Sequence, residues 1–498
     1  MTRRRLRTRT RQGDVLRAGF QAVRDEQGVP AAFPPEVLAE AQATALAPQP
    51  PPTPDGSERR DVTDLPFVTI DPAGSTDLDQ AVHIERRGRG YRVHYAIADV
   101  ASFVPPGSAI DVEAHARGVT FYSPDLRTSL HPPVLSEGVA SLLPDVVRPA
   151  VLWRIDLDAA GRPVEVDVER ALVRSVAKLD YGQVQRALDD GTADDSLVCL
   201  REVGLLRQEL EVARGGIDVR VPDQEIEDDG PGYRLVMRAP HPVESWNAQI
   251  SLLTGMSAAR MMLDAGVGIV RTMPPPASDD YDRLRRTAAG LEIDWPQDVS
   301  YAQLVRDLDP RPPTNAAFLN LVTVLLRSAE YTVVDRAVDD DVPDVLRHAA
   351  VGAAYAHVTA PLRRLVDRYA AECCLSIAAG VAVPEWVLAA LPSLPEEMRT
   401  ADQRARALDR ACVDLVEAVL LESSVGQEFS AVVVDERREF DVVQLHWPAV
   451  RAKVPGGGLG LGNRVRVRLT GADPSRRRVD FVPVREEADE DERESQVS

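Results

Sequence analysis

Three aspartates lie close together in the stretch "FVTIDPAGSTDLDQAVHI": Asp71, Asp77 and Asp79. Asp77 and Asp79 are two residues apart, so in extended chain their side chains point the same way. The Pro, Gly and Ser residues before them favour a turn that brings Asp71 back. Clustered carboxylates raise each other's pKa, and a divalent cation such as Mg²⁺ or Mn²⁺ removes that cost. A polar turn with solvated acids is the alternative, and Gln80 stands where a fourth acid would suit a metal site.

A second candidate is the arginine motif "HVTAPLRRLVD". We expect Thr359 to cap a helix and Pro361 to lie in its first turn. Arg363 and Arg364 would then face the positive end of the helix dipole, a conflict that a bound phosphate would resolve. Alternatively, these arginines pair with acids such as Asp367. A metal site together with a phosphate site indicates phosphodiester hydrolysis.

The surrounding pattern predicts which elements position these residues. Short β-rich segments fill residues 64–180, and helical periodicity follows from about Tyr181. Strands followed by helices predict an α+β domain with a mixed sheet and surrounding helices. After Glu422, five β segments in about 60 residues fit a small OB-like barrel, which is an all-β fold that binds oligonucleotides.

The predicted domain boundaries follow these changes in secondary-structure pattern. Residues 1–57 form a basic arm, a helical segment and a Pro-rich linker, and residues 58–424 form the catalytic domain. The barrel takes residues 425–486, and residues 487–498 form an acidic tail that we expect to be disordered.

Composition narrows the class of protein. A net charge of −20 argues against a protein that coats DNA, although a local basic track is still compatible with a nucleic-acid enzyme. The four cysteines form no CxxC pair, which indicates free thiols. No apolar run is long enough for a membrane helix and no secretory signal is evident, so we expect a cytoplasmic protein without a membrane partner.

Taken together, the motifs resemble the RNase II/RNB family of exoribonucleases. "TIDPAGSTDLDQA" matches the family's T-I-D-x5-D-x-D-D-A signature except at Gln80, and "HVTAPLRRL" follows its arginine motif. The blocks "LHPPVLSEGVASLLPDVVR", "AKLDYGQVQ" and "RSAEYTVVD" occur in the family's order. The resemblance covers roughly residues 60–422, and the terminal barrel resembles the family's S1 domain.

The resemblance implies a monomeric, Mg²⁺-dependent 3′→5′ exoribonuclease, with Mn²⁺ as a possible substitute. It would take single-stranded RNA with a free 3′ end and release nucleoside 5′-monophosphates. By position, Asp71, Asp77 and Asp79 would be the metal and catalytic acids, with Gln80 in the place of a fourth metal ligand. Asp71 and Asp77 would chiefly hold the metal centre, Asp79 would be the acid on which catalysis most depends, and Arg363 would bind the phosphate. Arg364 would contact the RNA backbone.

Further positions are implied to bind RNA. Tyr122 and Tyr181 match places where the family stacks bases, with core packing as the alternative. The second stacking aromatic aligns with Ile226, so the base clamp would be looser. In the barrel, Arg466 lies in an alternating run from Arg464 to Arg468 on one strand face, for which RNA contact and a solvated face are both open.

Two other functions remain open. One is an RNA-binding protein whose RNB-type core is catalytically weakened, because a glutamine at position 80 brings no charge to the metal. The other is a metal-dependent phosphodiesterase acting on small nucleotides, which would need neither a barrel nor a long channel domain.

Overall fold

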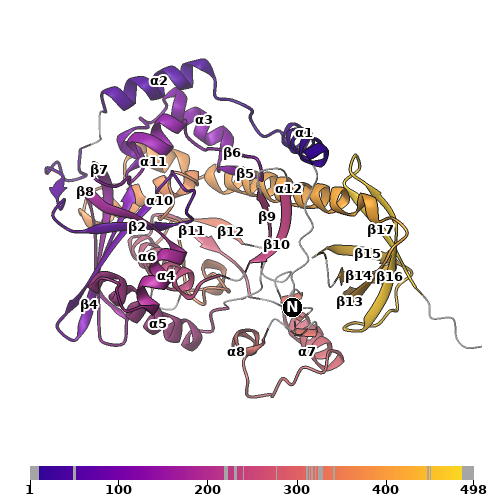
Figure 1. Ribbon diagram of the computed structural model, residues 1–498. Coiled ribbons are helices and arrows are strands. Elements are labelled where there is room, and N and C mark those ends of the chain that lie inside the picture. The colour runs from indigo at the N-terminus through magenta and orange to yellow at the C-terminus, as the bar shows by residue number, and fades with distance from the viewer. Residues whose placement is uncertain are drawn as a thin grey trace, which may run out of the picture.

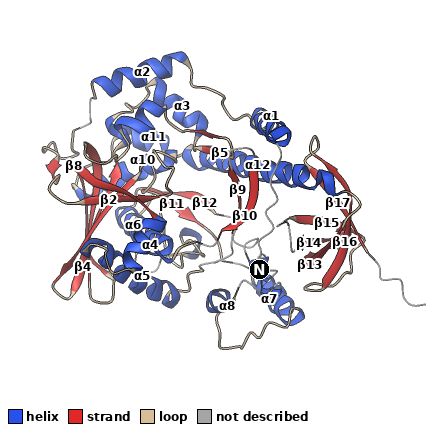
Figure 2. Cartoon of the chain, in the orientation of Figure 1, coloured by secondary structure: helices blue, strands red, loops and turns tan. Residues whose placement is uncertain are grey.

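The computed structural model describes residues 10–48, 52–217, 223–228, 233–238, 240–275, 277–309, 312, 314–315, 318–319, 321–322, 329–339, 342–445, 448 and 450–484. The two larger strand assemblies lie at opposite ends of the molecule, with helices and short strand pairs between them (Figure 2). The basic arm before Thr10 and the predicted acidic tail therefore lie outside the described residues.

The larger strand assembly is a six-stranded sheet that closes on itself. Its strand order is β1-β8-β2-β3-β4-β7, and β7 pairs again with β8. The long strand β8 makes this closure possible, because its first part pairs with β7 and its last part runs parallel to β2. The strands are β1 (Arg60–Asp61), β2 (Phe67–Asp71), β3 (Gln80–Arg87), β4 (Gly90–Ala98), β7 (Val147–Leu157) and β8 (Pro163–Asp180).

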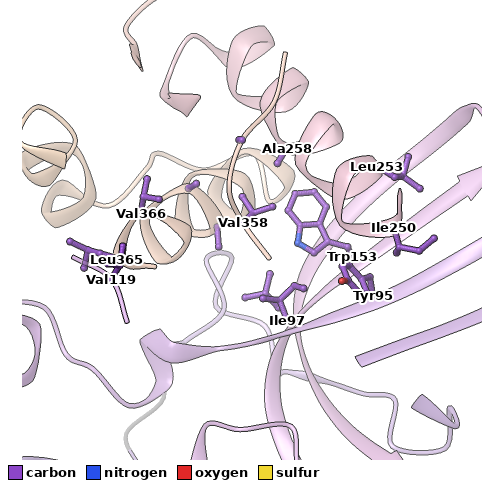
Figure 3. Close-up of a cluster of buried hydrophobic side chains, with 14 of the residues drawn as sticks. Tyr95, Ile97, Val119, Trp153, Ile250, Leu253, Ala258, Val358, Leu365 and Val366 are labelled. Carbon is purple, nitrogen blue, oxygen red and sulfur yellow. The ribbon is translucent and has the colours of Figure 1, made fainter. Parts of the chain in front are cut away.

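Helices cover this sheet on the side toward the rest of the molecule (Figure 1). Tyr95, Ile97 and Trp153 of the sheet face Ile250 and Leu253 of one helix across the core (Figure 3). Burial of these large side chains is worth about 1.5–3 kcal/mol each, which fixes the helices relative to the strand ends. The described helices are α1 (Thr10–Glu26), α2 (Pro35–Leu46), α3 (Ala109–Arg117), α4 (Tyr181–Asp189), α5 (Asp195–Ala213), α6 (Pro242–Ala265), α7 (Ser278–Gly290), α8 (Tyr301–Asp307), α10 (Leu365–Ala378), α11 (Glu385–Ala390) and α12 (Leu394–Leu421).

The N-terminal helices pack into the rest of the protein. Leu16, Phe20 and Val23 of α1 belong to the main core, and α1 lies along α12. The sequence predicted a helical segment within residues 1–57, and the structure confirms it as α1 and α2. Their packing contacts could not be predicted, because the apolar face of a helix does not specify its partner.

Short two-stranded sheets complete the larger domain. The pairs are β5 (Phe121–Ser123) with β6 (Leu126–Thr128), β9 (Asp223–Asp228) with β10 (Tyr233–Arg238), and β11 (Gly268–Thr272) with β12 (Glu330–Val334). Residues 316–331 belong to the region of helical periodicity that follows Tyr181. They fall mainly outside the described residues, and their end begins β12.

The second strand assembly is the five-stranded sheet β15-β14-β13-β16-β17, an S1-like barrel. Its strands are β13 (Glu428–Glu436), β14 (Phe440–Leu445), β15 (Arg451–Pro455), β16 (Arg464–Asp473) and β17 (Arg478–Pro483), all of which were predicted. β15 and β17 at the two edges lie near each other, so the sheet is almost closed. Val433, Val443, Val467 and Phe481 fill its interior.

All four cysteines are free and buried. Among the described residues, no helix combines the length and apolar character needed to cross a bilayer.

Candidate active site

The acidic cluster sits at adjacent strand ends of the closed sheet. Asp71 is the last residue of β2, and Gln80 is the first residue of β3. β2 runs parallel to β8 with Asp71 in register with Asp180, which caps α4. Because parallel strands end at the same edge, Tyr181 at the start of α4 comes close to Asp71. Burial raises the pKa of Tyr181, and the charge of Asp71 adds to this rise.

Asp79 joins the acidic loop to the arginine motif. Its Oδ2 accepts a hydrogen bond from Arg363 Nε at 2.7 Å, and its Oδ1 accepts one from the Leu362 backbone N–H at 2.8 Å. The Asp79 side chain is buried, whereas that of Arg363 is 41% exposed. The Nη atoms of Arg363 have no hydrogen-bond partner among the described residues, so they remain available to an anion.

The start of the helix after the arginine motif differs from the prediction. Thr359 was expected to be the N-cap and Pro361 to lie in the first turn, but α10 begins at Leu365 with Arg364 as its N-cap residue. Residues 360–364 form a turn whose backbone pairs with Val119 and its neighbours, and this tertiary pairing overrides the local capping signal. The prediction of Thr359 as N-cap is therefore wrong.

Arg364 has a different role from Arg363. Its Nε and Nη2 donate to the two Asp367 oxygens at 2.8 and 2.7 Å, and Asp367 is fully buried. The Ala360 N–H also donates to Asp367, at 2.7 Å. The alternative of an ion pair with Asp367 thus holds for Arg364, which fixes the turn that presents Arg363.

Gln80 also links the two motifs. Its Nε2 donates to the Thr359 carbonyl oxygen, 279 residues along the chain. This bond orients the side-chain amide, and no described residue donates to its Oε1. An aspartate could not make this bond, because a carboxylate has no N–H to donate.

Arg127 of β6 is a site residue that the sequence analysis missed. Its guanidinium contacts Asp77 and lies 2.6 Å from Glu137, so it bridges two acids. Arg127 pairs in register with Tyr122 of β5, which places both side chains on one face of the β5–β6 hairpin. The only available signal was their spacing, five residues apart across the turn residues "SPD".

The electrostatics of the site are dominated by burial. Desolvation raises the pKa of Asp79 to about 7, although Arg363 and the Leu362 N–H oppose this shift. Desolvation likewise raises the pKa of Asp71 to about 6, with Arg363 opposing and Asp77 adding to the rise. No hydrogen bond from a described residue reaches the Asp71 carboxylate. Lys178, one of two lysines in the chain, lowers its pKa slightly.

Within the described ranges, no set of three or more Asp, Glu, His or Cys side chains is arranged so that it would hold a metal ion. Asp77 forms an ion pair with Arg127, and Asp79 forms one with Arg363. The remaining donors nevertheless fit a hard cation, because the Asp71 carboxylate is desolvated and no described residue donates a hydrogen bond to it or to the Gln80 amide oxygen.

The two tyrosines lie on either side of this site. Tyr122 is 52% exposed, and partial desolvation raises its pKa while Arg363 lowers it and Asp77 and Asp79 raise it further. Tyr181 is half-buried and contacts Asn247 of α6, another residue that the sequence did not single out. Ile226 of β9 packs against the main core.

In the barrel, the predicted arginine face is present on β16. Arg464, Arg466 and Arg468 are exposed and alternate with less exposed residues. Arg466 and Arg468 share the carboxylate of Glu428, at 2.6 and 2.8 Å. Both arginines are therefore already partly neutralised.

Known proteins match both parts of the chain. The RNB domain model matches residues 59–374, and the model of the RNase II-type exonuclease C-terminal S1 domain matches residues 427–484. Ribonuclease R of Escherichia coli strain K12 is 30% identical over 328 residues, covering 62% of this chain and 39% of that protein. This chain therefore spans well under half of that relative's length.

Two solved structures share the fold. The chain superimposes on Mycoplasma genitalium RNase R in complex with ribose methylated single-stranded RNA with a TM-score of 0.82, 20% identity, and coverage of 95% of this chain and 78% of that one. Yeast Ssd1, described as a pseudonuclease, gives a TM-score of 0.66 at 16% identity, with coverage of 86% and 53%. The chain belongs to the RNB-domain family, and its C-terminal barrel is an S1 domain of the RNase II-type exonucleases.

Proposed function

We propose that this protein is a metal-dependent exoribonuclease that shortens single-stranded RNA from its 3′ end and releases nucleoside 5′-monophosphates. The observation that carries this proposal is the buried contact between Asp79 and Arg363 beside a second, unpaired carboxylate. It combines a phosphate-binding cation and metal-type donors at one point of a chain in the RNB-domain family.

Arg363 supplies the phosphate contact. Asp79 holds its Nε, which orients the guanidinium plane and leaves the Nη edge facing outward. A guanidinium held in this way binds phosphate oxygens in bidentate fashion and stabilises charge that develops on them. Arg364 does not contact RNA in this proposal; it supports the turn through Asp367.

Asp71 and the Gln80 amide oxygen are the donors that would hold Mg²⁺, while Asp77 is paired with Arg127 and Asp79 with Arg363. Bound Mg²⁺ would polarise the phosphate and lower the pKa of a coordinated water. Asp79 keeps Arg363 and the acidic loop in register, so its loss would disturb the phosphate position as well as the local charge.

Tyr122 and Tyr181 are proposed to stack against bases at the 3′ end, and the exposed face of β16 with Arg466 is proposed to contact the RNA backbone. Stacking requires an accessible ring, and Tyr122 has the more exposed one. We further propose that the protein acts as a monomer in the cytoplasm, with the predicted boundaries near residues 57, 424 and 486.

The second candidate is an RNA-binding protein with a weakened nuclease core. The observation that favours it is Gln80, which contributes no negative charge and whose amide is committed to Thr359. The fold is compatible with this outcome, since Ssd1 shares it and is described as a pseudonuclease.

The deciding experiment follows 5′-labelled single-stranded RNA with Mg²⁺, Mn²⁺ or EDTA, for the wild type and Asp79→Asn. We expect metal-dependent shortening to a small limit product, and a loss of about 10²–10³-fold in Asp79→Asn with RNA binding retained. Asp167→Asn, a half-exposed acid paired with Arg154, is the control. Tight binding without shortening in either metal would establish the second candidate instead.

A comparison of cleavage rates on dinucleotides and on oligonucleotides distinguishes the proposed enzyme from the remaining alternative. A phosphodiesterase for small nucleotides would cleave them at least as fast as oligonucleotides, whereas the proposed enzyme prefers the longer RNA.

A further inference from the structure

Arg127 makes an unusual set of contacts for a residue beside a candidate metal site. One nitrogen contacts the Asp77 carboxylate, and the other lies 2.6 Å from Glu137 and donates to Thr76 Oγ1 at 2.8 Å. Thr76 Oγ1 in turn donates to Glu137 at 2.9 Å. The guanidinium therefore sits between two carboxylates, a position that a divalent cation bridging two acids would also take.

The charges around the site show what this contact achieves. Among the described residues, and apart from the mutually neutralised pair Arg364–Asp367, the charged side chains here comprise four acids and three bases: Asp71, Asp77, Asp79 and Glu137, against Arg127, Arg363 and Lys178. With every group ionised, one negative charge remains. One divalent cation would leave a single positive charge, which matches the single negative charge of a phosphodiester. Two would leave three positive charges in a partly desolvated site, where excess charge is costly.

The remaining donors also suffice for one ion. No described residue donates a hydrogen bond to Asp71 or to the Gln80 amide oxygen, whereas Asp77, Asp79 and Glu137 each have an arginine partner. The neutral Gln80 side chain and the Arg127 guanidinium at Asp77 therefore have the same electrostatic effect. Each makes the site less negative and so lowers the number of divalent ions that it can hold.

We propose that Arg127 is a positioning residue whose guanidinium takes the place of a second divalent cation at Asp77, so that the site holds one divalent ion. This inference rests on the proposed metal dependence. It predicts that Arg127 keeps Asp77 in place in the metal-free protein, and that removing the guanidinium opens a second ion site.

The test counts Mn²⁺ ions bound to the full chain by electron paramagnetic resonance of free Mn²⁺, without RNA. Sites that Asp71→Asn or Asp77→Asn removes are attributed to this cluster, which separates them from weak binding to other acids. We expect one such ion in the wild type, two in Arg127→Ala, and one again in Arg127→Ala combined with Asp77→Asn. Arg127→Lys, which keeps the charge, should hold one.

Arg154→Ala is the matched control. The Arg154 side chain is exposed to a similar extent, 26% against 23%, and it also bridges two acids, Asp167 and Glu165. This variant should bind one ion, as the wild type does. If Arg127→Ala fails to fold, Arg127→Gln provides the same loss of charge with more of the side chain kept.

Two outcomes overturn the inference: a wild type that binds none or two of these ions, or an Arg127→Ala variant that still binds one with unchanged affinity. Failure of the proposed function has a different signature. A wild type that binds one ion, gains a second in Arg127→Ala and yet never shortens RNA would support the role of Arg127 while rejecting exonuclease activity.

Discussion

The core site and the barrel both hold arginine–carboxylate contacts, but in different surroundings. Arg364 forms a bidentate contact with Asp367, which is fully buried and also accepts a hydrogen bond from the Ala360 backbone N–H. Arg466 and Arg468 share Glu428 on a strand face where the two arginine side chains are 65% and 51% exposed. A desolvated acid needs its partner, whereas water and salt replace most of an exposed contact. The buried pair in the core therefore fixes the conformation of the arginine turn, whereas the exposed barrel arginines remain available to a ligand.

The largest expected effect is that of Arg364→Ala on stability. The variant leaves Asp367 buried without its cation, so the free energy of unfolding should fall by about 3–5 kcal/mol. Urea unfolding followed by circular dichroism measures this loss, and Arg466→Ala is the exposed counterpart that should change it little. An equal loss of unfolding free energy in the two variants would contradict the idea that burial makes the core pair more important for stability.

The pH dependence of the metal-free protein tests the desolvated acid Asp71. Burial raises its pKa to about 6 in the folded protein, above the ordinary value for an unfolded chain, so folding favours the protonated form. The resulting stabilisation is full below about pH 4 and is lost as the pH rises through about 6, by at most about 3 kcal/mol.

In EDTA, we therefore expect the melting temperature to fall between pH 5 and pH 8, and Mg²⁺ to restore more stability at pH 8 than at pH 5. Asp71→Asn should reduce this dependence, and the remainder belongs to Asp79, whose pKa burial raises to about 7. An identical slope in that variant would assign the pH dependence to other groups.

Tyr122 should affect RNA binding rather than folding, because half of its surface is exposed. Tyr122→Ala should weaken binding of single-stranded RNA by about 1–3 kcal/mol, while Tyr122→Phe keeps the stacking ring and most of the affinity. Fluorescence anisotropy in EDTA measures binding without cleavage. A Tyr122→Ala variant with wild-type affinity would place the ring outside the RNA path.

The smallest effect is expected for Arg466→Ala. Loss of one exposed phosphate contact should weaken RNA binding by about 1 kcal/mol or less and reduce the slope of log affinity against log salt by about 0.7. Arg468 would still pair with Glu428, so stability should not change. An unchanged salt slope would leave Arg466 as part of a solvated strand face.

Local pattern was sufficient for most elements of this fold. Neighbouring residues predict β3, β4 and the barrel strands from their β-rich composition. They predict α5, α6 and α10 from helical periodicity. Pattern failed where a distant contact decides the conformation. Thr359 and Pro361 carry good helix-start signals, yet the turn that holds them pairs with residues near Val119, and the helix begins later.

The candidate site divides in the same way. Asp71, Asp77, Asp79 and the two arginines were found by residue type and spacing. Arg127 was not, because nothing in its sequence neighbourhood shows that it lies beside Asp77, 50 residues away. The different roles of Arg363 and Arg364 were equally hidden, since adjacent residues of one type look alike until their partners are known.

The sequence by itself determined the strands, the helices, the family and the acids and arginines that carry the candidate chemistry, because these depend on residue types in fixed local order. Only the tertiary structure decided which acid each arginine contacts, which carboxylate is left without a partner, and that Gln80 is tied to Thr359. Those features depend on burial and on contacts between distant segments, and both exist only once the closed sheet and the arginine turn have been brought together.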